Sequence, residues 1–312
     1  MLKRMIKVAA LAAAMRYSVG ALGVVPFVAC SDDSTEPSRG RELSLTLQGL
    51  EPLLNGFHYE AWALVGGQAL PAGKFNLDAQ GRLVDLNGAV ISNGTLRQSR
   101  DISGASAIVL TIEPSGDRDA TPTATHVLAG AVSGGTATLS VASPMALGSD
   151  FAAAQGSFIL ATPTDSDSGN ERSGVWFISL ASGSPAAGLT LPTLPAGWIY
   201  EGWAVVNGRP LTTGRFLNAR AADNAAPFSG TLAGPPFPGE DYLRNAPSGV
   251  TFPLDLRGAT IAITIEPEPD DAPAPFAFKP LLGTVAATAV DHVTLTLPNR
   301  AATLGSGTAT IR

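Results

Sequence analysis

The chain has 312 residues, a formal net charge of -6, 34 glycines, 24 prolines and 1 cysteine, and only 15% of its residues are charged. Its 20 Lys and Arg residues are spread too thinly to form the basic patch that phosphate binding requires, so we expect no nucleic-acid partner. A single cysteine excludes an internal disulfide framework and a cysteine-based zinc site, and the glycine and proline content favours an all-β fold with almost no helix.

The N-terminal segment has the pattern of a lipoprotein signal peptide. Basic residues precede an apolar run that ends at Cys30, and a polar stretch follows. Cleavage before this cysteine would leave it at the N-terminus, where it can be lipidated. The sequence therefore predicts a signal peptide at residues 1–29, lipidation of Cys30 and a solvated tether at residues 30–40.

This signal also predicts a location. The mature chain would be held on a bacterial membrane by its lipid anchor, facing the periplasm or the exterior, and Ser31 after Cys30 leaves outer-membrane sorting open. Arg16 interrupts the apolar run of the signal peptide. A start of translation at Met15 would leave a short apolar stretch of typical length after Arg16, so both Met1 and Met15 stay open as the start. The alternative is a plain transmembrane anchor, but the run is too short and broken for a span of about 20 residues.

An internal repeat dominates the rest of the chain. Residues 56–75 and 197–216 agree at 10 of 20 positions with a constant offset of 141. Each copy reads as a β-hairpin, because β-forming residues flank a Gly-Gly or Asn-Gly dipeptide of the kind found in type I′ turns. The turn predicts that Tyr59 lies opposite Lys74 and that Trp62 shares the core face with Phe75.

A second motif recurs at an offset of 153, where residues 107–114 and 260–267 both end in Ile-Glu-Pro. Together with short β-type runs, this predicts two tandem duplicated β-sandwich (immunoglobulin-like) domains at 41–162 and 173–312, joined by a polar linker at 163–172. We expect each domain to fold by itself. The repeated motif consists of Tyr59, Glu60, Trp62, Phe75, Glu113 and Pro114, and of Tyr200, Glu201, Trp203, Phe216, Glu266 and Pro267.

The order of these motifs resembles the C-terminal extracytoplasmic domain of anti-sigma-K factors. The resemblance rests on Tyr-Glu-x-Trp, a glycine turn, Pro-x-Gly-x-Phe, Ile-Glu-Pro, a loop with Pro122-Thr123, and Leu-x-Gly, and it occurs once per domain. It implies an envelope-exposed β-sandwich. The family's inhibitory segment is cytoplasmic and N-terminal, and only 29 residues precede Cys30 here, so the resemblance does not extend to that activity.

The residues that could carry chemistry favour structural roles. His58, His126 and His292 lie in or beside strands, and the chain has no Gly-x-Ser-x-Gly elbow. The repeated glutamates could serve glycoside hydrolysis, but Glu beside Trp or before Pro more often accepts backbone, Lys or Arg hydrogen bonds. Residues 165–171 alternate oxygen ligands without calcium-loop spacing, which indicates solvated linker. We therefore expect no catalytic residue, no metal and no cofactor.

The second copy carries 12 extra residues between its hairpin and its Ile-Glu-Pro strand, since the offset grows from 141 to 153. We interpret this insertion as a candidate binding loop formed by Phe237, Glu240, Asp241 and Tyr242. The alternative is that the loop covers an open end of its own domain, with Phe237 as a plug.

These observations predict a non-enzymatic, lipid-anchored cell-envelope protein that binds or senses an envelope protein or a glycan. One alternative is a glycan-acting enzyme or lectin, which a cleft lined by glutamate and tryptophan would favour and burial of Trp62 and Trp203 would disfavour. A second alternative is the extracytoplasmic part of a sigma-factor regulatory system.

Overall fold

The computed structural model describes residues 40–270 and 272–312. Every regular element in these two ranges is a β-strand or a 3-10 turn, which confirms the all-β class. The turns are Ser92–Gly94 (η1), Glu171–Ser173 (η2) and Ala301–Thr303 (η3). The predicted signal peptide, Cys30 and residues 31–39 of the tether lie outside the described residues.

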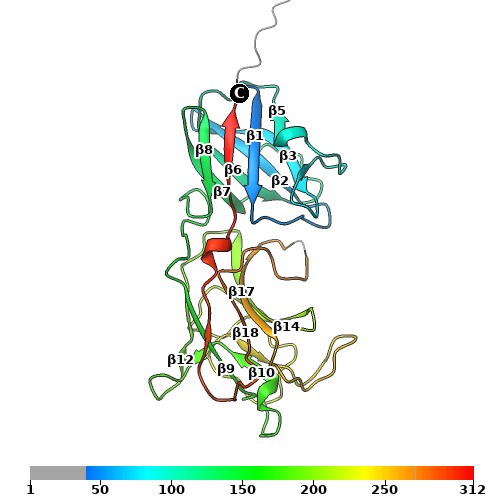
Figure 1. Ribbon diagram of the computed structural model, residues 1–312, viewed down its shortest axis with the longest axis vertical. Helices are drawn as coiled ribbons and strands as arrows, with labels where there is room; N and C mark the ends of the chain where they lie inside the picture. Colours follow the sequence, from blue (N-terminus) through cyan, green and yellow to red (C-terminus); the bar gives the residue numbers. More distant parts are fainter. Residues whose placement is uncertain (1–39, 271) are drawn as a thin grey trace, which may run out of the picture. The chain divides into compact units, whose positions relative to one another are not determined.

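The largest sheet has nine strands in the order β4-β3-β2-β6-β7-β8-β20-β1-β5, and all its pairs are antiparallel (Figure 1). Its strands are Glu42–Gln48 (β1), His58–Val65 (β2), Gln68–Leu77 (β3), Leu83–Val84 (β4), Thr95–Arg97 (β5), Ala105–Glu113 (β6), His126–Ser133 (β7), Thr136–Ser140 (β8) and Ser306–Ile311 (β20). The first copy of the repeat supplies β2, β3 and β6 at the centre of one half of this sheet.

The second copy of the repeat forms a four-stranded sheet in the order β15-β14-β17-β18, beside a five-stranded sheet that contains β13-β9-β10-β16 and β19. The strands are Gln155–Leu160 (β9), Gly174–Trp176 (β10), Ile178–Ser179 (β11), Ala186–Ala187 (β12), Leu189–Thr190 (β13), Trp198–Val206 (β14), Arg209–Phe216 (β15), Gly239–Asp241 (β16), Thr260–Pro267 (β17), Leu281–Thr284 (β18) and Leu295–Leu297 (β19). Strands β11 and β12 pair with each other.

Two strands correct the predicted domain boundaries. The C-terminal strand β20 belongs to the first sheet, where it lies between β8 and β1, as the red arrow in Figure 1 shows. Strand β9, predicted to close the first domain, pairs instead with β10, β13 and β19. The division into 41–162 and 173–312 is therefore wrong, because the chain leaves the first sheet after β8 and returns to it at its end.

The predicted linker at 163–172 connects two strands that pair with each other, β9 and β10. It is not a solvated joint. Within it the Thr164 side chain is buried, and its backbone N–H donates to Oδ2 of Asp241 at 2.8 Å. Asp165 Oδ2 accepts a hydrogen bond of 2.7 Å from Asn170, so the alternating oxygens of this segment hold the loop together.

The buried apolar side chains form one continuous cluster that includes residues of both copies, such as Tyr59 and Tyr200. At the junction, the space beside Gly305 is filled by Phe278 and Leu50, and a Cβ there would meet them at 2.8 and 3.0 Å. The expectation of two separate cores is therefore also wrong. The two sheets share a core, and the chain crosses between them twice.

Both hairpins contain the predicted turn, with positive φ at Gly66 and Gly67 and at Asn207 and Gly208. Next to the first turn, Val65 pairs with Gln68, which is the register that a two-residue turn requires. Further along, each hairpin has a β-bulge, between Ala61 and Trp62 in the first and at the same place in the second.

The bulge moves the register by one residue. Tyr59 therefore lies opposite Phe75 and not opposite Lys74. Tyr59 and Phe75 stack with ring centroids 5.5 Å apart and face the shared core, whereas Trp62 points to the other side of the sheet, against Val109 and Ala129. The predicted Trp/Phe core face is wrong, because an extra residue on one strand reverses the face of every side chain beyond it.

Candidate functional site

The polar residues of the repeated motif gather on the face of β2 and β14 that carries the tryptophans. In the first copy, Nε1 of Trp62 donates to Oγ1 of Thr111 at 2.8 Å. The Thr111 hydroxyl donates in turn to Glu113, which also accepts the backbone N–H of Thr123 at 3.1 Å. All of Trp62, Thr111 and Glu113 are buried, so this chain of hydrogen bonds pairs the indole N–H, the hydroxyl and Oε1 of the glutamate away from water, while Oε2 of Glu113 has no hydrogen-bond partner.

The second copy repeats this arrangement. Nε1 of Trp203 donates to Oγ1 of Thr264 at 2.8 Å, the Thr264 hydroxyl donates to Glu266, and the backbone N–H of Phe276 donates to Glu266 at 3.0 Å. Burial raises the pKa of Glu266 from 4.5 to about 7, against the opposing effect of the Thr264 hydrogen bond. The glutamate of Ile-Glu-Pro is thus the end of a structural hydrogen-bond chain in both copies.

The glutamate that follows the repeated tyrosine, Glu60 in the first copy, forms an ion pair with a basic side chain. In the first copy, Nζ of Lys74 lies 3.4 Å from Glu60 and 2.6 Å from Asp117. Burial raises the pKa of Glu60 to about 7, and the nearby ammonium of Lys74 opposes this rise. The same ammonium lowers the pKa of Asp117, chiefly through the hydrogen bond between them.

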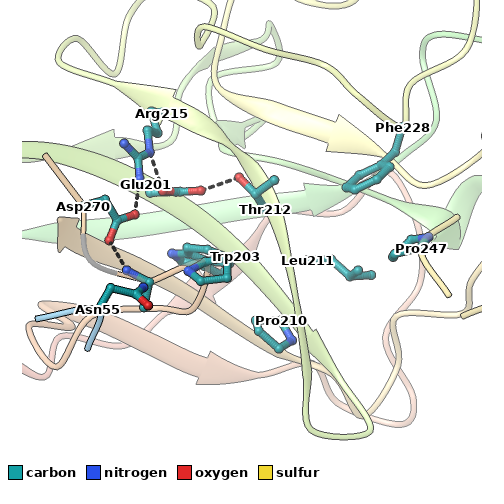
Figure 2. Close-up of a pocket in the computed structure, with 12 residues that line it drawn as sticks. Asn55, Glu201, Trp203, Pro210, Leu211, Thr212, Arg215, Phe228, Pro247 and Asp270 are labelled. Atoms are coloured by element: carbon teal, nitrogen blue, oxygen red, sulfur yellow. Dashed lines mark hydrogen bonds and ion pairs between the residues drawn. The ribbon is translucent and has the colours of Figure 1, made fainter. Parts of the chain in front are cut away.

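In the second copy an arginine takes the place of the lysine. Nε of Arg215 lies 2.8 Å from Oε2 of Glu201, and its NH2 group pairs with Asp270 (Figure 2). Oε1 of Glu201 also accepts the Thr212 hydroxyl at 2.6 Å. Both oxygens of this carboxylate therefore have partners, and the planar guanidinium bridges two acids at once.

This ion pair forms one end of a groove of about 620 Å³, drawn in Figure 2. Trp203, Leu211 and Phe228 supply apolar wall, and the lining is completed by Asn55, Pro210, Thr212, Pro247, Ala272 and Pro273. Asn55, which belongs to the chain before β2, lies beside Asp270 in this view. A ligand in this groove would meet apolar and proline surface along its length and charged groups at one end.

The corresponding side of the first copy carries a more apolar groove of about 470 Å³, lined by Trp62, Leu64, Val109, His126 and Met145 among others. His126 is oriented by a contact of 2.7 Å between its Nδ1 and the carbonyl oxygen of Met145. The two grooves are related by the repeat but differ in chemistry, because the first lacks the charged end of the second.

The predicted candidate binding loop is not a free loop. Gly239–Asp241 form β16, which pairs with β10, and Glu240, Asp241 and Tyr242 are fully buried. Phe237 packs against the cluster that contains Trp176 and Ile159. The binding interpretation is therefore wrong, and the alternative holds: the insertion covers its own part of the fold.

Sequence reasoning missed Thr111, Thr264, Asp117 and Asp270. Each pair is related by the offset of 153 that relates the two Ile-Glu-Pro strands, so extending the repeat beyond the glutamates would have found them. It also gave His58 no role beyond its place in or beside a strand, whereas the structure buries its side chain, and burial lowers its pKa. The structure brings His58 next to Glu60 and Asp117.

Within the described residues, no helix is long and apolar enough to span a membrane. Comparisons of the chain with family models, with curated proteins and with solved structures gave no match.

Proposed function

We propose that this chain is a non-enzymatic, lipid-anchored protein of the bacterial cell envelope, and that the groove beside Arg215 binds a segment of another envelope protein. This proposal is supported by the hydrogen bonds of the repeated motif, whose polar groups bond to one another inside the fold. In both copies the tryptophan N–H and the glutamates bond to side chains of their own copy, as Trp203 does to Thr264. These groups build the fold, and the groove next to them remains open for a partner.

The composition of the groove favours a protein segment over a glycan. Sugar rings stack on exposed aromatic faces, and Trp203 is only 4% exposed with its N–H turned inward. The remaining apolar wall consists of Leu211, Phe228, Ala272 and three prolines, which suits apolar side chains of an extended peptide. Arg215 and Asp270 at the end of the groove would select a polar or charged residue there.

The lipid anchor is supported by sequence alone. The apolar run that ends at Ala29-Cys30, and the polar residues after it, fit lipoprotein processing. The resemblance to anti-sigma-K C-terminal domains, which are extracytoplasmic, supports the same location for the mature chain. Metabolic labelling with a fatty-acid probe should mark the wild-type chain and spare Cys30→Ser, and equal labelling of both would contradict the anchor.

The binding surface is tested by blocking the groove. Pro247 and Pro273 line it with exposed side chains, so Pro247→Arg and Pro273→Arg should obstruct it without disturbing the core. Leu86→Arg, at a residue that is 55% exposed and outside the groove, is the matched control. Cross-linking in intact cells should give a discrete protein adduct with the wild type and the control that both groove variants lose. Retention of the adduct by the groove variants would reject this surface.

The glycan alternative keeps one supporting observation, namely that Glu201 and Trp203 line the same groove. Binding of purified protein to peptidoglycan and to envelope polysaccharide distinguishes the two. Saturable glycan binding that Pro247→Arg abolishes would replace the protein partner with a glycan.

A further inference from the structure

The first copy of the repeat contains three groups that can bind a metal ion. His58 and Glu60 alternate along β2 and therefore project from the same face of the sheet. Asp117 comes from the loop after β6. One ring nitrogen of His58 and one carboxylate oxygen from each acid all lie within 4.8 Å of one another.

His58 is buried in a way that leaves one nitrogen free. Its side chain is 4% exposed, and Nδ1 lies 3.4 Å from the carbonyl oxygen of Gly56. A carbonyl only accepts, so Nδ1 carries the proton and Nε2 has a bare lone pair. Nε2 is buried and has no hydrogen-bond partner. A buried acceptor without a partner is rare, and a histidine fixed through Nδ1 by a backbone carbonyl is the usual arrangement of a metal ligand.

The site already attracts a cation. Nζ of Lys74 lies 2.6 Å from Oδ2 of Asp117 and 3.4 Å from Oε2 of Glu60. The lysine side chain is 25% exposed and reaches the acids from solvent, so it can withdraw without unfolding the chain. Glu60 is almost fully buried and its Oε2 makes no hydrogen bond, so it gains from any cation that comes closer than the ammonium does.

We propose that His58, Glu60 and Asp117 bind a divalent transition-metal ion of the Zn²⁺ class, which displaces Lys74. One imidazole and two carboxylates, with a water molecule in the fourth position, are a donor set that zinc accepts. Ca²⁺ and Mg²⁺ prefer oxygen donors alone, so the imidazole selects against them. The exchange is reversible, because Lys74 can return to the acids when the ion leaves.

The second copy provides a natural comparison within the same chain. At the position of His58 it has Ile199, and in place of Lys74 it has Arg215. Arg215 bridges Glu201 and Asp270, and Glu201 also accepts the Thr212 hydroxyl. This copy has no imidazole donor, and its acids are held by a guanidinium in a fixed geometry. We therefore expect one ion per chain, in the first copy.

The test is a calorimetric titration of the metal-free protein with Zn²⁺, with Co²⁺ absorption as an independent report on the ligands. We expect one Zn²⁺ per chain, Co²⁺ d–d bands, and an upward shift of the melting temperature with Zn²⁺ but not with Ca²⁺. His58→Ile, which copies the second repeat, should weaken Zn²⁺ binding at least tenfold and remove the Co²⁺ bands. Asp117→Asn should do the same, and it tests the site again if His58→Ile does not fold.

Two further variants separate this site from adventitious binding. His292 is exposed, with its Nδ1 3.3 Å from Asp291, and offers the obvious surface alternative. His292→Gln should therefore leave the affinity unchanged. Lys74→Met removes the competing cation and should tighten Zn²⁺ binding. Absence of stoichiometric binding in both the wild type and Lys74→Met, or equal binding by His58→Ile, would overturn the proposal.

Discussion

The indole of Trp62 donates its N–H to Oγ1 of Thr111 at 2.8 Å across two neighbouring strands, on the face of the sheet that points away from the shared core. Trp203 and Thr264 make the same bond at the same length. The N–H of a buried indole usually finds a hydrogen-bond partner, and in both copies the threonine of the neighbouring strand supplies it. The threonine therefore allows both copies to bury a tryptophan on this face of the sheet.

Replacing the threonine should destabilise both copies by similar amounts. Thr111→Val and Thr264→Val each leave an indole N–H unpaired and remove a donor from a buried glutamate, which we expect to lower the free energy of unfolding by about 2 to 3 kcal/mol. Denaturant unfolding measures the change. Thr46→Val, at an exposed position of β1, is the matched control and should stay within about 0.5 kcal/mol of wild type. A loss in only one copy would contradict an equal role for the two bonds.

The C-terminal strand should be indispensable to the first sheet. A chain that ends at Leu304 lacks β20, so β1 and β8 each lose one of their two partner strands and two inner edges of the sheet become unpaired. We expect the truncated chain to lose the slow hydrogen exchange of amides in β1 and β8. Removing the single residue Arg312 takes away its backbone hydrogen bonds to Arg41 and Glu42 at the start of β1, so the other amides of β1 and β8 should keep their protection. Native protection in the long truncation would contradict the observed strand order.

The same topology predicts the behaviour of a fragment. Residues 41–162 expressed alone contain β1 to β9 but lack β20, so we expect no cooperative thermal transition. Addition of a peptide with the sequence of residues 304–312 should restore one, because it supplies the missing central strand. Differential scanning calorimetry of the fragment, with and without the peptide, tests this. A cooperative transition without the peptide would mean that the sheet tolerates the gap.

Stability should fall as the pH rises from about 4.5 to 7. Burial raises the pKa of Glu266 from 4.5 to about 7, so the folded chain holds this proton more tightly than the unfolded chain does. Stability is then lost as the pH passes from the unfolded to the folded value, by at most about 3 kcal/mol for one such group. Glu60 and Glu240 are shifted to about 7 in the same direction and add to the slope.

Glu266→Gln should therefore flatten the dependence of the unfolding free energy on pH between 4.5 and 7. Asp255→Asn is the control, because hydrogen bonds from Arg257 lower the pKa of Asp255 to about 2 and it titrates below this window. Urea unfolding at a series of pH values measures both variants. An unchanged slope in Glu266→Gln would show that its carboxyl is already ionised across this range.

Asp241 should be a stability residue. Its carboxylate is buried and accepts the Trp176 N–H at 2.6 Å and the Thr164 N–H at 2.8 Å. Asp241→Ala leaves these donors without a partner, and we expect a cost of about 3 to 5 kcal/mol. Arg220→Ala, at an exposed loop residue, is the control for thermal unfolding. A near-neutral Asp241→Ala would restore the interpretation of this insertion as a dispensable binding loop.

The sequence by itself determined the features that depend on neighbouring residues. Glycine, proline and alternating apolar residues predicted the all-β class, and the Gly66-Gly67 and Asn207-Gly208 turns fixed two hairpins whose turns the structure confirms. The repeat of residues 107–114 at 260–267 likewise marked two strands, β6 and β17, which pair with β2 and β14 at equivalent places. These features follow from local backbone preference and the two-residue period of a strand.

Only the tertiary structure decided which strands belong together and which face is the core. The pairing of β20 with β1 joins Leu43 to Ile311, and no local pattern encodes a contact over that separation. The bulge at Trp62 adds one residue, and one residue is enough to turn a predicted core face outward. The cluster of His58, Glu60 and Asp117 likewise exists only once β2 and the loop after β6 are folded, since Asp117 is remote along the chain from the other two.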